Sequence, residues 1–104
     1  MMCAVAVRQI KPESYDQFRT AWQHDPWLPR YDRALILRRE DSPDQVLTIA
    51  FFDGTPEEYE TARDEPETMA AEERRLRRVA EIEERVLLSA VFELAEEVLP
   101  PAAG

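Results

Sequence analysis

Hydrophobic residues gather in four short stretches that are typical of β-strands. The most apolar stretch is residues 46–52, in which Thr48 is the only polar side chain, and such a run predicts a strand that is covered on both faces. Three other stretches are rich in aliphatic and β-branched residues and predict further strands: residues 3–10, 34–39 and 86–92. The polar residues 40–44 predict a turn that joins the second and third strands as a hairpin.

A different spacing of apolar residues predicts helices between these strands. Tyr15, Phe18, Ala21 and Trp22 share one helical face, so we expect a helix with Pro12 as its first residue, followed by a proline-containing loop over residues 23–32.

A second helical region follows the third strand. Thr55, Pro56 and Glu58 form a capping-box pattern that predicts its start, and the stretch 63–66, which ends in a proline, predicts a break. A longer helix should resume at about Glu67, and the side chains expected to face inward are Met69, Leu76, Val79 and Ala80.

The last segment fits two interpretations. Residues 86–92 read as a buried strand, yet Leu88, Phe92, Ala95 and Leu99 also fall on one helical face. We favour the strand, because the order strand, helix, strand, strand, helix leaves a place for one closing strand.

This order of elements predicts an α+β fold of the ferredoxin-like βαββαβ type, a four-stranded antiparallel sheet with its helices on one face. We expect one domain over residues 1–99 and a flexible tail over 100–104. The strands are apolar on both faces, so a monomer would expose a large apolar patch. The pattern therefore predicts a homodimer that forms through the open sheet face.

Composition and charge limit the partners further. The chain has 104 residues and a formal net charge of −9, which opposes binding to nucleic acid or to a membrane surface. The arginine-rich stretch 74–78 is flanked by glutamates and predicts a solvated, salt-bridged helix face.

The single cysteine, Cys3, has no partner for a disulfide or a zinc site and is expected to be a small core residue. With no signal peptide or membrane span in the pattern, we expect a cytoplasmic protein.

Two joints between strand and helix carry a family resemblance. The first is residues 10–18, IKPESYDQF, and the second is residues 46–59, VLTIAFFDGTPEEY. With these joints the chain resembles the dimeric α+β barrel superfamily, in particular its antibiotic biosynthesis monooxygenase-like branch. The resemblance implies a homodimer and a pocket between sheet and helices. Its members include cofactor-independent monooxygenases that act on polycyclic aromatic compounds, haem-degrading enzymes, isomerases and proteins with no known activity.

The chain departs from the residues that this family typically uses. It has no asparagine, and Val5 stands near the position of the family's asparagine on the first strand. Phe52 stands where the family has a tryptophan at the end of the third strand, and no histidine occurs between Glu57 and Glu84, where haem-degrading members place an iron ligand. These departures disfavour haem degradation and remove the usual polar anchor of the oxygenases.

The remaining candidates for chemistry are few. His24, oriented by Asp25 or another acid, is a candidate general base, and Tyr59 is a candidate proton donor. The candidate substrate-binding residues are Trp22, Trp27, Thr48, Phe52 and Arg38. Five of these residues have a structural alternative: Trp22 and Tyr59 as packing residues, Trp27 as a loop anchor, His24 as an exposed side chain and Arg38 as an ion-pair partner. No metal site and no cofactor are expected.

Two functions follow from these observations. One is a homodimer that binds a small apolar or aromatic molecule and oxygenates or isomerises it without a cofactor. The alternative is a non-catalytic dimer, a binding, regulatory or pathway-accessory protein that has lost the catalytic residues of the family. An open pocket between sheet and helices would favour ligand binding, whereas a filled interior would leave only an interaction role.

Overall fold

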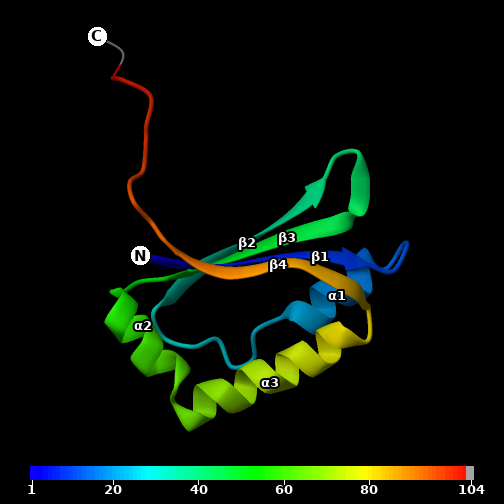
Figure 1. Ribbon diagram of the computed structural model, residues 1–104, viewed down its shortest axis with the longest axis horizontal. Coiled ribbons are helices and arrows are strands. Elements are labelled where there is room, and N and C mark those ends of the chain that lie inside the picture. Colours follow the sequence, from blue (N-terminus) through cyan, green and yellow to red (C-terminus); the bar gives the residue numbers. More distant parts are fainter. Residues whose placement is uncertain (103–104) are drawn as a thin grey trace.

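The strands form one sheet with the helices on one face. The computed structural model describes residues 1–102. The elements follow in the order β1 (Met2–Ile10), α1 (Tyr15–Trp22), β2 (Tyr31–Arg39), β3 (Ser42–Phe52), α2 (Pro56–Arg63), α3 (Pro66–Ala80) and β4 (Glu83–Glu93). The strands pair antiparallel in the order β2-β3-β1-β4, and the three helices lie on the same side of the sheet (Figure 1). The predicted ferredoxin-like α+β fold is confirmed.

The last strand settles the ambiguity at the end of the chain. β4 runs over Glu83–Glu93 and pairs with β1, so the strand interpretation of residues 86–92 is confirmed. The chain then leaves the sheet without regular structure over residues 94–102 (Figure 1). One contact holds its start, since the Leu94 amide donates to the carbonyl of Met1 at 2.9 Å. Ala103 and Gly104, which belong to the predicted tail, lie outside the described residues.

Three predicted boundaries are wrong. β2 starts at Tyr31 and not at residue 34, so the loop predicted over residues 23–32 ends at Arg30. The hairpin turn is not the stretch 40–44 but only Glu40 and Asp41, because strand pairing continues until Arg39 faces Ser42. The first helix starts at Tyr15 and not at Pro12. Glu13, which lies between them, has a φ of 59°, and a residue in the left-handed region cannot continue a right-handed helix.

The two predicted signals around the second helical region are both confirmed. The Thr55 hydroxyl accepts from the Glu58 amide at 3.1 Å, and the Glu58 carboxylate accepts from the Thr55 amide at 3.0 Å. This reciprocal pair satisfies two amides that the first turn of α2 leaves free. α2 ends at Arg63, and Pro66 begins α3 after a short break.

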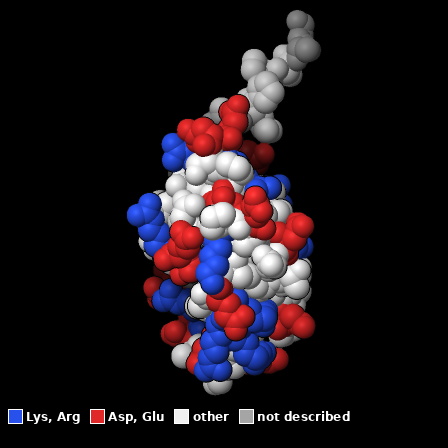
Figure 2. Space-filling model, turned by 90° about the vertical axis from the view of Figure 1, so that its right-hand side faces the viewer, with Lys and Arg blue, Asp and Glu red and all other residues white. Residues whose placement is uncertain are grey.

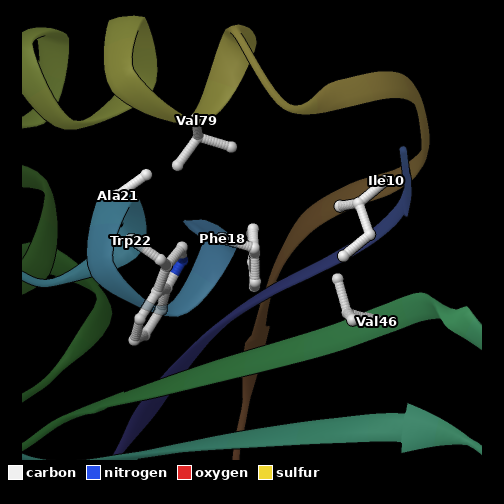
Figure 3. Close-up of a cluster of buried hydrophobic side chains, with 6 residues drawn as sticks. All are labelled: Ile10, Phe18, Ala21, Trp22, Val46 and Val79. Atoms are coloured by element: carbon white, nitrogen blue, oxygen red, sulfur yellow. The ribbon is translucent and has the colours of Figure 1, made fainter. Parts of the chain in front are cut away.

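The main core lies between the sheet, α1 and α3. Figure 3 shows the side chains that form it, which come from β1, α1, β3 and α3: Ile10, Phe18, Ala21, Trp22, Val46 and Val79. A smaller cluster at the other end of the sheet contains Met2, Phe52 and Tyr59. Cys3 is buried, as expected of a small core residue.

The inward face of α3 differs from the prediction. The buried residues of this helix are Ala71, Arg75 and Val79, which recur every four residues and so share one stripe. Val79 was expected there, but the expectation is wrong for Met69, Leu76 and Ala80, all of which are exposed. The sequence pattern favoured aliphatic residues and overlooked an arginine in the middle of the inward stripe.

The arginine-rich stretch 74–78 is therefore only partly a solvated face. Arg77 is exposed and pairs with Glu73, as predicted, whereas Arg75 is buried and pairs with Glu72. Basic and acidic side chains lie intermixed at the bottom of Figure 2, on the helical side of the molecule. Within residues 1–102, none of the helices has both the length and the apolar character needed to cross a membrane.

The face of the sheet opposite the helices has no cover within the protomer. Four aliphatic or aromatic side chains on this face are between 42% and 50% exposed: Leu35, Leu37, Leu88 and Phe92. Val5, Val7, Leu47, Ile49 and Phe51 lie between them and are half-buried. This open sheet face is the apolar patch that the alternation of the strands predicts.

The capping box gives a direct test of the α2 boundary. Replacing Thr55 with alanine removes the acceptor of the Glu58 amide, and we expect the free energy of unfolding to fall by about 1 kcal/mol. Urea denaturation monitored by circular dichroism measures this change. The matched control is Thr61→Ala, because Thr61 is an exposed threonine inside the same helix. Equal effects of the two substitutions would contradict a capping role for Thr55.

Candidate functional site

A large cavity lies between the sheet and α3. Its volume is about 1120 Å³, ample for a drug-sized or polycyclic ligand. Its floor is built from short side chains of the two central strands, namely Ala4 and Ala6 of β1 and Thr48 and Ala50 of β3. Because these side chains are small, the helical layer does not fill the space above them. The cavity therefore exists because the central strands have small side chains on the face toward the helices.

Aromatic side chains line one end of the cavity. The His24 ring lies 4.7 Å from that of Trp22 and 6.0 Å from that of Tyr31, measured between centroids. Trp22, His24, Tyr31 and Tyr59 all line the cavity. Burial raises the pKa of the Tyr31 phenol above its usual value, and the neighbouring Tyr59 adds to this shift. The Tyr31 phenol is therefore neutral near pH 7 and able to donate a hydrogen bond.

The segment that carries His24 is held in place by α3. Arg78 of that helix donates to the carbonyl of Ala21 at 3.2 Å and to the carbonyl of Gln23 at 3.0 Å. These are carbonyls that the end of α1 leaves without a helical partner, and a basic side chain is a favourable group there. Arg78 thus fixes the end of α1, and with it the direction in which His24 leaves the helix.

His24 is uncharged and has an open acceptor. Burial, assisted by the charge of Arg75, lowers the pKa of its imidazole to about 4, although the charge of Glu72 acts in the opposite direction. Its Nε2 atom is buried and has no hydrogen-bond partner in the described part of the chain. A buried polar atom without a partner is costly. A ligand hydroxyl or amide in the cavity would relieve this cost.

The other end of the cavity is basic. Arg8 of β1 and Arg75 of α3 both line it and are both buried. The Arg8 side chain donates to Glu83 at 3.0 Å and, more weakly, to the Thr48 hydroxyl at 3.4 Å. Arg75 pairs with Glu72 and lies over the Trp22 ring at 5.4 Å. The cavity therefore has a basic end at Arg8, and Arg75 extends from there to the aromatic side chain of Trp22.

The predicted site residues divide into two groups. His24, Tyr59, Trp22 and Thr48 line the cavity together. Three others do not: Phe52 packs between Tyr31 and Tyr59, Trp27 donates its indole N–H to the Tyr31 carbonyl, and Arg38 lies over the Tyr15 ring. Asp25 is exposed and does not contact His24 through any hydrogen bond or ion pair of the described chain, so His24 has no orienting acid at that position.

The sequence interpretation missed the basic end. Arg8, Arg75, Glu72 and Glu83 were not among the candidates. Arg8 did carry a usable signal, because it alternates with Ala6 and Ile10 on the face that β1 turns toward the core. A charge on the buried face of an otherwise apolar strand indicates a paired or functional group. Arg75 carried no such signal, because it stands among several arginines in residues 74–78. As for a metal, no three His, Cys, Asp or Glu side chains gather as ligands in residues 1–102.

Comparisons with known proteins show the fold. No protein-family model matches the sequence, and no curated protein matches it. Solved structures do match. SnoaB, a cofactor-independent oxygenase from Streptomyces nogalater, is similar with a TM-score of 0.66 and 16% identity, covering 96% of this chain and 97% of that one. A Chloroflexus aurantiacus protein named for the antibiotic biosynthesis monooxygenases has a TM-score of 0.62 and 12% identity, covering 99% and 96%.

A third such structure, from Deinococcus radiodurans, has a TM-score of 0.63 and 12% identity and covers 98% of this chain and all of its own. At these identities the likeness establishes a shared fold. The predicted resemblance to the antibiotic biosynthesis monooxygenase structures is therefore confirmed at the level of the fold, which by itself does not determine chemistry.

The pKa of His24 predicts how stability depends on pH. In the unfolded chain an imidazole has a pKa of about 6.5, whereas in the folded chain the value is about 4. Between these values the unfolded chain binds a proton that the folded chain does not, so stability falls as the pH is lowered from about 6.5 to about 4. His24 is the only histidine, so one imidazole proton signal in an NMR titration reports its pKa directly.

Urea denaturation at about pH 7 and about pH 5 gives the companion measurement. The wild type is expected to lose more stability between the two conditions than His24→Gln, which has no imidazole to protonate. A titration midpoint near 6.5 in the folded protein would show that His24 is freely solvated.

Proposed function

We propose that this protein binds a small aromatic molecule in the cavity and oxygenates it without a cofactor. The observation that carries the proposal is the unpartnered Nε2 of His24 in the wall of a large hollow lined by aromatic rings. The shared fold with SnoaB, a cofactor-independent oxygenase, supports it as an analogy. The substrate must itself supply the electrons, so it is a polycyclic phenol or ketone with an acidic C–H or O–H group.

The chemistry needs one proton acceptor and a dry pocket. His24 is neutral near pH 7 and accepts the proton of the substrate, while the Tyr59 hydroxyl donates to the substrate oxygen. Burial lowers the pKa of His24 to about 4, which makes it a weak base. The reaction therefore requires a substrate whose anion is well delocalised. Dioxygen attacks the resulting carbanion, and loss of water converts a methylene group and one O₂ into a carbonyl group and one water.

The same proton transfer without dioxygen would isomerise the substrate. Return of the proton to another carbon of the delocalised anion moves a double bond and consumes nothing else. Oxygen uptake distinguishes the two reactions, because isomerisation requires none.

We further propose that two protomers associate through the open sheet face. Its exposed leucines and phenylalanine form an apolar surface that water solvates poorly. Burying it at roughly 25 cal/mol per Å² stabilises a chain whose own core is small. Association through this face leaves the cavity free, since the cavity lies on the side of the helices.

The second candidate function is binding without catalysis. Phe52, at the position where the family resemblance places a tryptophan, is fully buried between two tyrosines and does not line the cavity. Val5 stands near the place of the asparagine. A protein that keeps the cavity and lacks these groups suits a dimeric carrier, regulatory or pathway-accessory role.

Oxygen consumption tests the enzymatic proposal. Anthrone, a tricyclic ketone with an acidic methylene group, is expected to be converted to anthraquinone with uptake of one O₂, faster than in buffer alone. His24→Gln should lower the rate on the order of a hundredfold, and Tyr59→Phe should lower it as well. Arg39→Gln is the control, because Arg39 is exposed and pairs with Asp41 far from the cavity. Binding of anthrone without oxygen uptake would favour the non-catalytic candidate.

Light scattering tests the dimer. The wild type is expected to show twice the mass of one chain at concentrations of roughly ten micromolar, as an interface of standard size permits. Leu35→Asp places a charge on the open sheet face and should shift the protein to the monomer. Met69→Asp is the control, because Met69 is also an exposed apolar residue but lies on α3. A monomeric wild type would refute association through the sheet.

A further inference from the structure

Two buried arginines face the same cavity in a strongly acidic chain. Arg8 is 6% exposed and Arg75 is 8% exposed, although the chain as a whole has a formal charge of −9. Burying a guanidinium group is costly unless it is paired and hydrogen-bonded. Packing alone does not require two guanidinium groups in one wall, because aliphatic side chains would fill the same space without the cost of burying a charge.

The existing partners of these arginines leave donors free. Arg8 donates its Nε–H to the Glu83 carboxylate, and Arg75 donates one N–H to the Glu72 carboxylate. A guanidinium has more N–H groups than these contacts use. No nitrogen of either arginine is among the buried side-chain atoms that lack a partner, so the free donors are accessible, and both residues line the cavity.

The two guanidinium groups also repel each other. Burial lowers the pKa of Arg8, and the charge of Arg75 lowers it further, while Glu83 acts in the opposite direction. For Glu72, burial alone would raise the pKa, but the hydrogen bond and charge of Arg75 lower it overall. Glu72 is therefore ionised, and the neighbouring acids already have partners: Glu83 pairs with Arg8 and Glu73 pairs with Arg77. An anion between Arg8 and Arg75 would reduce their repulsion.

The register of the sheet gives the distance between Arg8 and the aromatic end. Arg8 faces Val46, and Ala4 faces Ala50, so the two rungs lie four residues apart on β1, about 13 Å along the strand. The Tyr31 rung, opposite Phe52, lies beyond Ala4. A ligand with two or three fused rings and an acid group at one end matches this length.

We propose that the natural ligand is an aromatic carboxylic acid, whose carboxylate binds Arg8 and Arg75 beside the Thr48 hydroxyl while its rings lie at the Tyr31 end. This inference rests on the proposed function, because it assigns the ligand class of the same cavity. A carboxylate has the planar, two-oxygen geometry that guanidinium groups bind best. The short side chains of Ala4, Ala6 and Ala50 leave room for the rings above the sheet.

Calorimetric titration with a matched pair of compounds tests the proposal. Anthracene-2-carboxylate is expected to bind the wild type at least about tenfold more tightly than its methyl ester, because only the acid forms charge-assisted hydrogen bonds. The double variant Arg8→Gln/Glu83→Gln removes both members of one ion pair, so no unpaired charge is left behind. It should show a reduced preference for the acid over the ester, because only Arg75 remains to bind the carboxylate. Arg39→Gln should keep the preference of the wild type.

The outcomes separate this inference from the proposed function. Equal binding of acid and ester by the wild type overturns the anion subsite and leaves ligand binding in place. A preference for the acid that is undiminished in the double variant also overturns it, since Arg8 then makes no contribution to binding the carboxylate. If neither compound binds, the proposed function falls together with the inference. The comparison within the wild type needs no variant, so a variant that fails to fold does not prevent a decision.

Discussion

A four-stranded sheet has two faces, and this chain has helices for only one of them. All strands carry apolar side chains on both faces, so the helices of the protomer cover the apolar side chains of only one face. The covered half contains the core and the cavity, and the open half remains a surface of leucine, isoleucine and phenylalanine. Because the cavity and the open apolar surface lie on opposite faces of the same strands, a substitution can alter one of them without the other.

The cavity exists because the covered face is not packed uniformly. At one end of the sheet large side chains such as Phe18, Ile10 and Val46 fill the space under the helices. In the middle, alanines and Thr48 leave it open. The helix above that opening contributes an arginine where a core helix would normally contribute an aliphatic residue. This break in the usual pattern distinguishes the wall of the cavity from the hydrophobic core.

Features of the structure that depend on residues close together in the sequence could be predicted, whereas features that depend on contacts between distant residues could not. The fold, the capping box and the strand at 86–92 could be predicted, because each depends on local spacing or on the order of elements. The start of α1 could not, since it depends on Glu13, whose amide bonds to Asp44 on a distant strand. Arg75 was hidden for a similar reason: several arginines stand together in sequence, and only the packing of α3 selects the one that is buried.

The buried imidazole has a consequence for how the protein behaves in acid. Its carboxylates give the chain a large negative charge near neutral pH, and this charge keeps molecules apart in solution. Acidification removes that charge as the carboxylates protonate, in the same range in which protonation of His24 favours the unfolded chain. Colloidal repulsion and conformational stability are thus lost together, while the apolar sheet face stays available for contact. Mild acid should therefore favour precipitation rather than an expanded soluble state.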